Sequence, residues 1–163
     1  MSAVTRLRGK QVPKMASKQR LRLWIRLLRT SRAIESELRE RLRLTFRITL
    51  PQFDVMAALA RNNDGMTMTE LSRLLMVSNG NVTGIIDRLV TDKIVLRKAP
   101  VEDRRAIIVR LTPKGLSQFE TMARIHEGWV DRLLSDFDDA KTSAMIDNLD
   151  GLATRIRNGR ARR

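Results

Sequence analysis

The sequence predicts a mainly α-helical protein that carries one small β-hairpin. Two observations support this fold class. Over most of the chain, apolar residues recur at spacings of three and four, which is the period of a helix with one buried face. Only between residues 94 and 111 does the period change to two. With 163 residues, of which 42% are hydrophobic, the chain is long enough to bury a core.

The first two helices are predicted from spacing and from proline. The longest helical pattern covers residues 21–46, and Trp24 lies on its apolar face. About seven turns is long for a small domain, so we expect this helix to pack along a partner. Pro51 suits the first turn of a second helix over residues 51–62. The sequence Asn-Asn-Asp-Gly at 62–65 then predicts a turn.

Two shorter helices follow, and each has a clear start. Thr67 and Glu70 have the spacing of a capping box in front of a third helix at about 68–75. After a short turn, Ser78 is a good N-cap for a fourth helix at about 79–91.

A hairpin is predicted next. Residues 94–97 and 106–111 have strand-like sequences, and residues 100–105 between them form a charged tip. A helix, a short turn, a helix and a two-stranded hairpin make up the winged helix-turn-helix arrangement. Two further helices, at 113–134 and about 140–156, close the chain.

Charge is concentrated at the two ends of the chain. The formal net charge is +14, of which residues 1–20 hold +6 and residues 155–163 hold +5, both without an acidic residue. Such an excess favours a polyanionic partner, with nucleic acid first and an anionic membrane second. Both ends are poor in large apolar residues, so we expect flexible arms.

Several classes of protein are excluded by composition. No apolar run approaches the roughly 18–20 residues of a membrane span, and the first 14 residues lack the apolar stretch of a secretory signal. The absence of Cys and the single His exclude disulfides and a plausible metal site. We find no nucleophile elbow, no phosphate-cradling glycine loop and no His–carboxylate metal spacing. We therefore expect a cytoplasmic protein that is not an enzyme, has no cofactor and does not bind a membrane.

The start of the fourth helix is the first candidate for DNA contact, because N-terminal residues of a helix in the major groove meet base edges. Its residues are mostly small and neutral, and Gly84 costs the helix about 1 kcal/mol against Ala, which suggests a reason beyond folding. A solvated helix surface is the alternative. Further along, Arg88 is expected to meet phosphate. The candidates on this helix are Ser78, Asn79, Gly80, Asn81, Thr83, Gly84 and Arg88.

The hairpin tip is the second candidate. Arg104 and Arg105 could enter the narrow minor groove, where the potential attracts a guanidinium. Asp103 could hold Arg105 in a bidentate pair before DNA arrives. The alternative is an exposed surface ion pair, which contributes little.

From about Leu21 to Leu152, the sequence resembles the MarR family of bacterial transcription regulators. The resemblance rests on three stretches, residues 68–71 (Met-Thr-Glu-Leu), residues 81–89 (Asn-Val-Thr-Gly-Ile-Ile-Asp-Arg-Leu) and the wing, in which Asp-Arg-Arg at 103–105 is followed by Val-Arg-Leu-Thr at 109–112. It implies a homodimer on a pseudo-palindromic operator in double-stranded DNA.

The resemblance also implies how the chain is divided. A helical dimerisation region is formed by the first helix and the last two. The expected parts are a basic flexible N-terminal arm at 1–20, a dimerisation region at 21–50 and 113–156, a winged helix-turn-helix lobe at 51–112, and a basic C-terminal tail at 157–163.

Residues 50–55, 74–81 and 126–129 are similar to family members that respond to aromatic acids or hydroxycinnamoyl-CoA thioesters. This implies a repressor that an aromatic ligand releases by favouring a different spacing of the two recognition helices. The candidate ligand residues are Trp24, Arg26, His126 and Trp129. The alternatives are ordinary packing for the two Trp residues, an interface role for the His, and a solvated basic face for the Arg.

Two points remain open in the sequence. The family usually has Gly where this chain has Lys93, so either Lys adopts a left-handed C-cap at a cost of about 1 kcal/mol or the turn differs. The alternative function is a constitutive DNA- or RNA-binding module without a ligand switch. Aromatic residues are only 4% of the chain, which offers few side chains on which RNA bases could stack.

Overall fold

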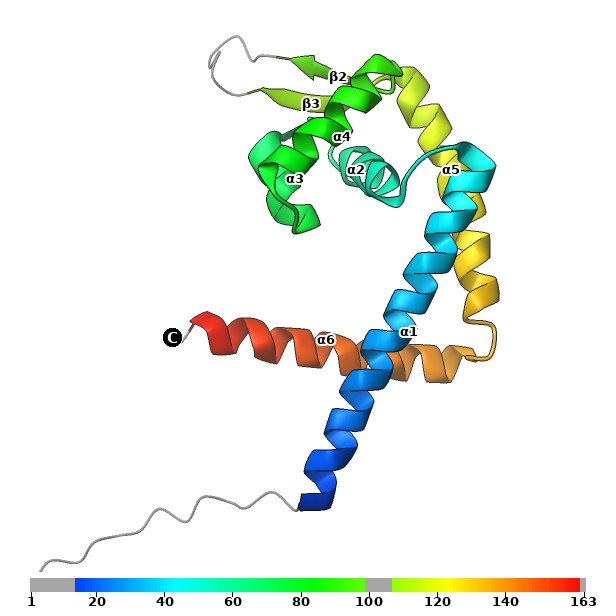
Figure 1. Ribbon diagram of the computed structural model, residues 1–163, viewed down its shortest axis with the longest axis vertical. Helices are drawn as coiled ribbons and strands as arrows, with labels where there is room; N and C mark the ends of the chain where they lie inside the picture. The colour runs from blue at the N-terminus through cyan, green and yellow to red at the C-terminus, as the bar shows by residue number, and fades with distance from the viewer. Residues whose placement is uncertain (1–13, 99–106, 162–163) are drawn as a thin grey trace, which may run out of the picture.

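The computed structural model describes residues 14–98 and 107–161, and it is mainly helical (Figure 1). Its elements are α1 (Lys14–Phe46), α2 (Leu50–Ala60), β1 (Met66–Thr67), α3 (Met68–Leu75), α4 (Asn79–Thr91), β2 (Val95–Lys98), β3 (Ile108–Leu111), α5 (Pro113–Leu133) and α6 (Asp139–Ala161). We call α2 to β3 the lobe. It lies at one end of the molecule, while α1 and α5 lead away from it and α6 runs across α1 (Figure 1). The predicted fold class is confirmed.

Most of the core belongs to the lobe, with contributions from α1 and α5. Leu71 on α3, Ile86 on α4 and Val109 on β3 are fully buried. From outside the lobe, Leu42 on α1 and Met122 on α5 join the same buried cluster. The lobe is therefore held against the far ends of the two long helices, and α4 has one face fixed by packing.

Local signals place the two helices of the helix-turn-helix. Thr67 and Glu70 form the predicted capping box: the Thr67 hydroxyl accepts from the Glu70 amide at 3.2 Å, and the Glu70 carboxylate accepts from the Thr67 amide at 2.8 Å. The Ser78 hydroxyl accepts from the amide of Asn81 at 3.3 Å, which confirms Ser78 as the N-cap of α4. A second capping box, between Thr49 and Gln52 at the start of α2, was not predicted.

The sheet has one strand more than the predicted hairpin. The order is β1-β3-β2, with both pairs antiparallel. Met66 of β1 pairs with Val109 of β3, and Arg97 of β2 pairs with the same Val109. Because β3 is hydrogen-bonded to β1 on one edge and to β2 on the other, the two hairpin strands are attached to the segment that leads into α3. We use "wing" for β2, β3 and the segment between them.

The outer helices are longer than predicted. α1 begins at Lys14 instead of residue 21, so the expectation of a flexible arm fails for residues 14–20. α6 continues to Ala161 instead of ending at 156, so most of the predicted tail is helical. Lys, Arg, Gln, Met and Ala dominate these segments, and all are good helix formers. The remainder of the predicted arm, residues 1–13, lies outside the described residues.

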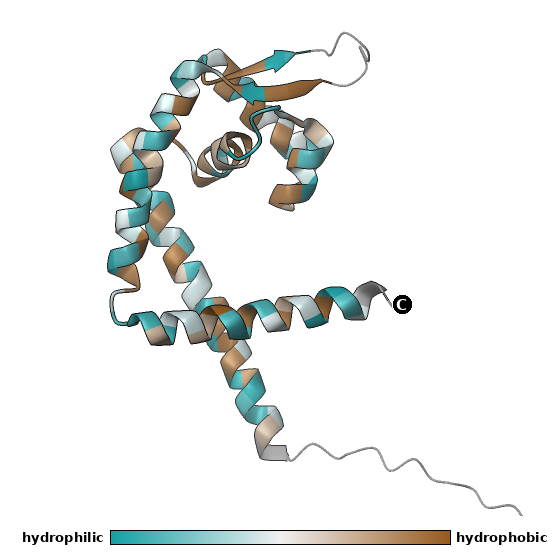
Figure 2. Ribbon diagram, turned by 180° about the vertical axis from the view of Figure 1, so that it is seen from behind, coloured by the Kyte–Doolittle hydropathy of each residue, from teal (hydrophilic) through white to brown (hydrophobic). Residues whose placement is uncertain are grey.

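Two helical stretches expose apolar side chains. Among the described side chains, none on α6 is buried, and apolar residues recur along it (Figure 2). The N-terminal half of α1 likewise exposes Leu21, Leu23 and Trp24, the last with 58% of its surface accessible. Within the described part of the chain, no helix combines the length and the apolar character that a membrane crossing needs.

Candidate nucleic-acid interface

The outer face of α4 gathers the residues predicted for the major groove. Ser78, Asn79, Gly80, Asn81, Thr83, Gly84 and Arg88 are all exposed. The opposite face of the helix is buried through Val82, Ile86 and Leu89. A Cβ added at Gly80 or Gly84 would meet nothing within 4 Å, so neither glycine is required by packing inside the protein. Packing within the described residues therefore does not explain either glycine.

One polar side chain on this face already forms a hydrogen bond within the chain. The Thr83 hydroxyl donates to the carbonyl of Asn79 at 2.9 Å. Its oxygen therefore remains free to accept, for instance from a base amino group. Within the described residues, the side chains of Asn79 and Asn81 form no hydrogen bond. Both amides can therefore donate and accept outward.

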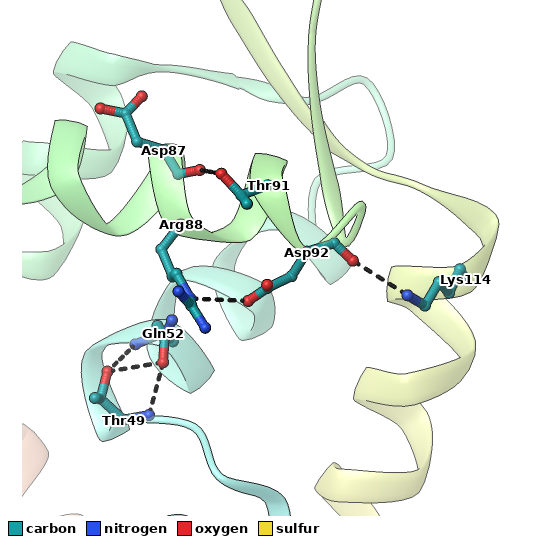
Figure 3. A network of polar contacts seen from close by, with 7 residues as sticks. All are labelled: Thr49, Gln52, Asp87, Arg88, Thr91, Asp92 and Lys114. Atoms are coloured by element: carbon teal, nitrogen blue, oxygen red, sulfur yellow. Dashed lines mark hydrogen bonds and ion pairs between the residues drawn. The ribbon is translucent and has the colours of Figure 1, made fainter.

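Arg88 and Asp87 leave α4 in different directions (Figure 3). The Arg88 side chain points toward the start of α2, where Thr49 and Gln52 lie, and its Nε is 3.2 Å from a carboxylate oxygen of Asp92. This ion pair is exposed and contributes little to stability. The Arg88 guanidinium is therefore available to a stronger anionic partner.

Asp87 connects α4 to the wing. Nη2 of Arg97, on β2, donates to Oδ1 of Asp87 at 2.6 Å. On the other strand, Nε of Arg110 donates to the carbonyl of Asp64 at 2.6 Å, in the turn before β1. Two arginines thus tie the wing root to the rest of the lobe. Asp103, Arg104 and Arg105 lie outside the described residues.

The end of α4 keeps the left-handed turn that the sequence left open. Lys93 has φ +59°. Its amide donates a hydrogen bond to the carbonyl of Val90 at 3.0 Å, and the amide of Ile94 donates one to the carbonyl of Leu89 at 2.9 Å. This pair of hydrogen bonds is the Schellman motif, in which the left-handed residue is most often Gly. The chain therefore enters the wing by the turn that Gly would give, and the side chain of Lys93 makes it strained.

The predicted ligand residues on α5 are packed into an aromatic cluster. Trp129 is buried, with its ring 5.9 Å from that of Phe46 and the Arg41 guanidinium 6.0 Å from its centroid. His126 stacks on Phe53 at 4.6 Å between ring centroids. Burial there lowers the pKa of His126 below its ordinary value of 6.5. These residues join α5 to the ends of α1 and α2.

The other two ligand candidates lie elsewhere on α1. Trp24 is exposed, and Arg26 borders a hollow of about 350 Å³ with Arg22 and Arg29. Trp24 precedes Phe46 by a length of helix that spans about 33 Å. The structure therefore does not bring Trp24 and Arg26 together with His126 and Trp129 within one chain.

A cavity of about 700 Å³ lies between the end of α1, the start of α2 and the outer face of α4. We call it the α1–α4 cavity. From α4 it is lined by Gly80, Asn81, Gly84 and Arg88, which are four of the predicted DNA-contact residues. Its apolar wall consists of Ile48, Leu50, Pro51, Val77 and Ile85.

Two arginines of α1 face the same cavity. Arg39 pairs with Glu35, and Arg43 pairs with Glu40 through two bonds of 2.8 and 2.6 Å. The sequence alone gave neither arginine a role. No local signal would have found them, because only the folding of α2 and α4 against α1 creates the cavity.

A smaller cavity of about 190 Å³ adjoins the first and shares Arg39 with it. Glu35 and Asp54 both line it. Burial raises the pKa of Asp54 above its ordinary value, and the negative charge of Glu35 adds to the effect. Elsewhere in the described residues, no group of three or more His, Asp or Glu side chains is placed to hold a metal ion.

Comparison with known proteins identifies the family. The MarR family model matches residues 48–107. The transcriptional activatory protein BadR of Rhodopseudomonas palustris is 37% identical over 79 residues, which are 47% of this chain and 45% of that protein. The chain thus spans less than half the length of BadR.

Two solved structures extend the match to nearly the full chain. A MarR family transcriptional regulator from Silicibacter pomeroyi superposes with a TM-score of 0.73 and 32% identity, covering 86% of this chain and 97% of that one. MepR of Staphylococcus aureus, solved as a complex with DNA, shares the fold with a TM-score of 0.71, 21% identity and coverage of 82% and 97%. From the family model over the lobe and this similarity along the whole molecule, the chain belongs to the MarR family of winged helix-turn-helix transcriptional regulators.

Proposed function

We propose that this chain binds double-stranded DNA with sequence specificity as a homodimeric repressor, and that a small aromatic ligand, either an aromatic carboxylate or a hydroxycinnamoyl-CoA-type thioester, releases it from a pseudo-palindromic operator. The observation that carries the DNA half is the outer face of α4. It presents two Asn amides and two glycines that the fold itself does not need. Asn amides pair with adenine in two bonds, and glycines allow the duplex to come close.

The wing supports the same function. Its strand β2 is held against α4 by the contact between Arg97 and Asp87, and Arg104 and Arg105, which the sequence predicts as wing contacts, lie outside the described residues. MepR, which has the same fold, was solved with DNA. A helix in the major groove and an arginine-bearing hairpin beside it would read adjacent parts of one half-site.

Two features support the homodimer. The exposed apolar faces of α6 and of the N-terminal half of α1 need a cover, and the lobe is too far along α1 to supply it (Figure 2). The charges are complementary as well. Residues 14–34 hold seven basic and no acidic side chains, whereas residues 127–150 hold seven acidic and two basic ones. A second copy would offer its acidic segment to the basic stretch of α1.

The ligand half of the proposal is supported by the α1–α4 cavity. Its volume of about 700 Å³ lies within the range of small-molecule sites, and an apolar wall with a few polar groups is the usual composition of such sites. BadR is an activator by name, and the Bacillus subtilis relative YetL is a repressor by name. We propose repression, in which case a ligand that competes with a contact needed for DNA binding would switch the regulated genes on.

Selection from a randomised duplex pool tests the DNA function directly. We expect the full chain to enrich a two-fold symmetric motif with half-sites about one helical turn apart. Asn81→Ala should weaken binding to that motif about tenfold or more by anisotropy titration. Arg61→Gln, a charge-removing control at the far end of α2, should bind as the natural chain does. A random pool after selection, or tighter binding to RNA at equal salt, would refute the proposal.

A further inference from the structure

We propose that the N-terminal half of α1 binds the phosphates of a second segment of double-stranded DNA while the lobe holds the operator. The surface is a row of five cationic side chains, which we call the basic stripe: Lys18, Arg22, Arg26, Arg29 and Arg32. The inference rests on the proposed function for the lobe and adds a second contact to it. With this contact, one protein would hold two stretches of duplex together.

The residues of the basic stripe lie on one face of α1. Their spacings along the chain are four, four, three and three residues, which keep side chains on the same side of a helix. All five side chains are exposed. Lys18 and Arg32 are about 21 Å apart along the helix axis, and a duplex carries about twelve phosphate charges over that length. A duplex lying beside the helix therefore offers more phosphates than the stripe has cations.

The charge of the stripe is not neutralised within the described part of the chain. In the C-terminal half of the same helix, Arg39, Arg41 and Arg43 each pair with a glutamate three or four residues earlier. Residues 14–34 include no acid, and among the described residues the stripe forms no ion pair. Like charges three or four residues apart destabilise a helix. Contact with a polyanion would remove this repulsion.

Three arginines of the stripe surround a hollow in the surface of α1. The hollow has a volume of about 350 Å³, and it is lined by Arg22, Ile25, Arg26, Arg29 and Thr30. A guanidinium presents five N–H donors in a plane and forms strong contacts with phosphate oxygens, and the Thr30 hydroxyl is a further donor. A phosphate group in this hollow would therefore receive hydrogen bonds from more than one side chain.

The stripe stays accessible when a second copy covers the apolar side of α1. Leu27 and Ile34, which are partly buried, and the exposed Trp24 lie on the side of the helix that faces away from the stripe. Arg20 is four residues from Trp24 and lies on that same side. The acidic segment of a second copy can therefore pair with Arg20 while the stripe faces outward.

The operator lies too far from the stripe to be its partner. Arg43 borders the α1–α4 cavity beside α4. Measured along α1 from Arg43, the stripe extends from about 17 Å at Arg32 to about 38 Å at Lys18. The N-terminal half of α1 leads away from the lobe, and β2 and β3 lie at the opposite end of the molecule (Figure 1). A duplex that meets α4 and these strands thus leaves the stripe to another segment of DNA.

Two other polyanions fit the stripe less well than a duplex. Single-stranded RNA is held largely by stacking of its bases on aromatic rings, and none of the five stripe residues is aromatic. A membrane surface takes up the apolar side of a helix together with its charges. Here the apolar side faces away from the stripe and is partly buried by the protein itself. Regularly spaced phosphates without bases to stack are what this row of cations matches.

Capture of a second duplex tests the proposal. The operator duplex found by selection is attached by one end to a sensor surface and loaded with the full chain. A short duplex that lacks the selected motif is then injected at several salt concentrations. With five phosphate contacts, the logarithm of its association constant should fall with the logarithm of the salt concentration at a slope of about −4.5. No capture while the chain stays on the operator would overturn the proposal.

A triple variant removes the centre of the stripe: Lys18→Gln, Arg22→Gln and Arg29→Gln. Its slope should be about −1.8, because each lost phosphate contact removes about 0.9, and Arg29→Gln alone should give about −3.6. Gln is a good helix former, so α1 should persist, which circular dichroism checks. The control variant removes the same charge elsewhere: Arg61→Gln, Arg124→Gln and Arg132→Gln.

The control variant should keep the slope of about −4.5, and both triple variants should bind the operator equally tightly. An unchanged slope in the stripe variant would overturn the proposal. Weaker operator binding by the stripe variant than by the control would also overturn it, because the stripe would then contact the operator itself.

Two further injections over the loaded surface test the class of partner. One is an RNA hairpin with as many phosphates as the second duplex, and the other is a suspension of vesicles that contain phosphatidylglycerol. Both should be captured more weakly than the duplex at equal salt. Stronger capture of either would assign the stripe to that partner and overturn the assignment to DNA.

Failure of this inference is distinguishable from failure of the proposed function. If the operator binds and no second duplex is captured, only the inference fails. If selection enriches no operator, the proposed function fails. The full chain and the stripe variant are then titrated with an unrelated duplex, and equal salt slopes would show that the stripe does not bind DNA either.

Discussion

Arg97 on β2 and Asp87 on α4 form a 2.6 Å contact that ties the wing to the recognition helix. The Arg97 side chain is 35% exposed and that of Asp87 is 56% exposed, so the bond lies at the surface of the lobe. A surface pair adds little to stability, yet it can fix the angle between two elements that must reach one duplex. Its value should therefore appear in DNA binding more than in folding.

Arg97→Gln is expected to lower the free energy of unfolding by less than about 1 kcal/mol. DNA affinity should fall further than that, because the wing loses one of its anchors. Urea unfolding and anisotropy titration measure the two effects separately. The double variant Asp87→Arg with Arg97→Asp reverses the pair, and it should recover DNA affinity relative to the single variants. No recovery would mean that the pair does not position the wing.

Gly115 and Gly84 should respond in opposite ways to replacement by Ala. A Cβ at Gly115 would overlap the backbone carbonyl of Ile94, so Gly115→Ala should cost about 1–3 kcal/mol of unfolding free energy. Gly84→Ala meets open space and should stabilise the helix by about 1 kcal/mol while weakening DNA binding. Thermal unfolding and anisotropy measure both variants. A Gly84→Ala chain that binds DNA unchanged would remove the argument from close approach.

Lys93→Gly should stabilise the chain by about 1 kcal/mol, because φ +59° is costly for any residue with a Cβ. Lys93→Ala serves as the control, since it removes the charged side chain but keeps the Cβ. Chemical denaturation of the two variants separates backbone strain from charge. Equal stabilisation by Gly and Ala would assign the effect to the lost ammonium group.

Stability should decline as the pH falls below about 6.5 because of His126. Burial lowers its pKa in the folded protein, so the unfolded chain binds the proton more tightly. The contribution is complete above the ordinary pKa and is lost as the pH falls from that value through the lower pKa of the folded protein. His126→Phe keeps a ring against Phe53 and removes the proton. Its melting temperature should change less between about pH 7.5 and about pH 5.5 than that of the natural chain. An equal change in both proteins would exclude His126 as the cause.

The sequence predicted best what is locally determined. The bounds of α3 and α4 are those expected, since capping residues and helical spacing act within a few residues of each other. The family of regulators also confirms the expectation that the chain is not an enzyme. The strand Met66–Thr67 was missed because it consists of only two residues and exists through its pairing with Val109 and Ile108, far along the chain.

The α1–α4 cavity was beyond sequence reasoning for the same physical reason. Arg39 and Arg43 are ordinary members of a charged helix face until α2 and α4 pack against α1. Conversely, Trp129 and His126 were candidates because residues 126–129 resemble those of aromatic-responsive family members, and their cluster with Phe46 and Phe53 gives them a packing role. Whether Trp24 and Arg26 touch a ligand stays a prediction.

Because α1 is one uninterrupted helix, a small tilt at its N-terminal end produces a larger displacement at its C-terminal end. One helix carries the basic stretch at 14–34 that a second copy would cover and, about 44 Å along the helix from Lys14, the backbone of Arg43. If the N-terminal part turns as a rigid rod, each degree of tilt moves the Arg43 end by about 0.8 Å. Because Leu42 is buried against the lobe, a tilt of a few degrees where two subunits would meet should displace the lobe with the end of α1. Mutations in the outer half of α1, at positions other than Trp24 and Arg26, should accordingly alter the response to ligand from a distance.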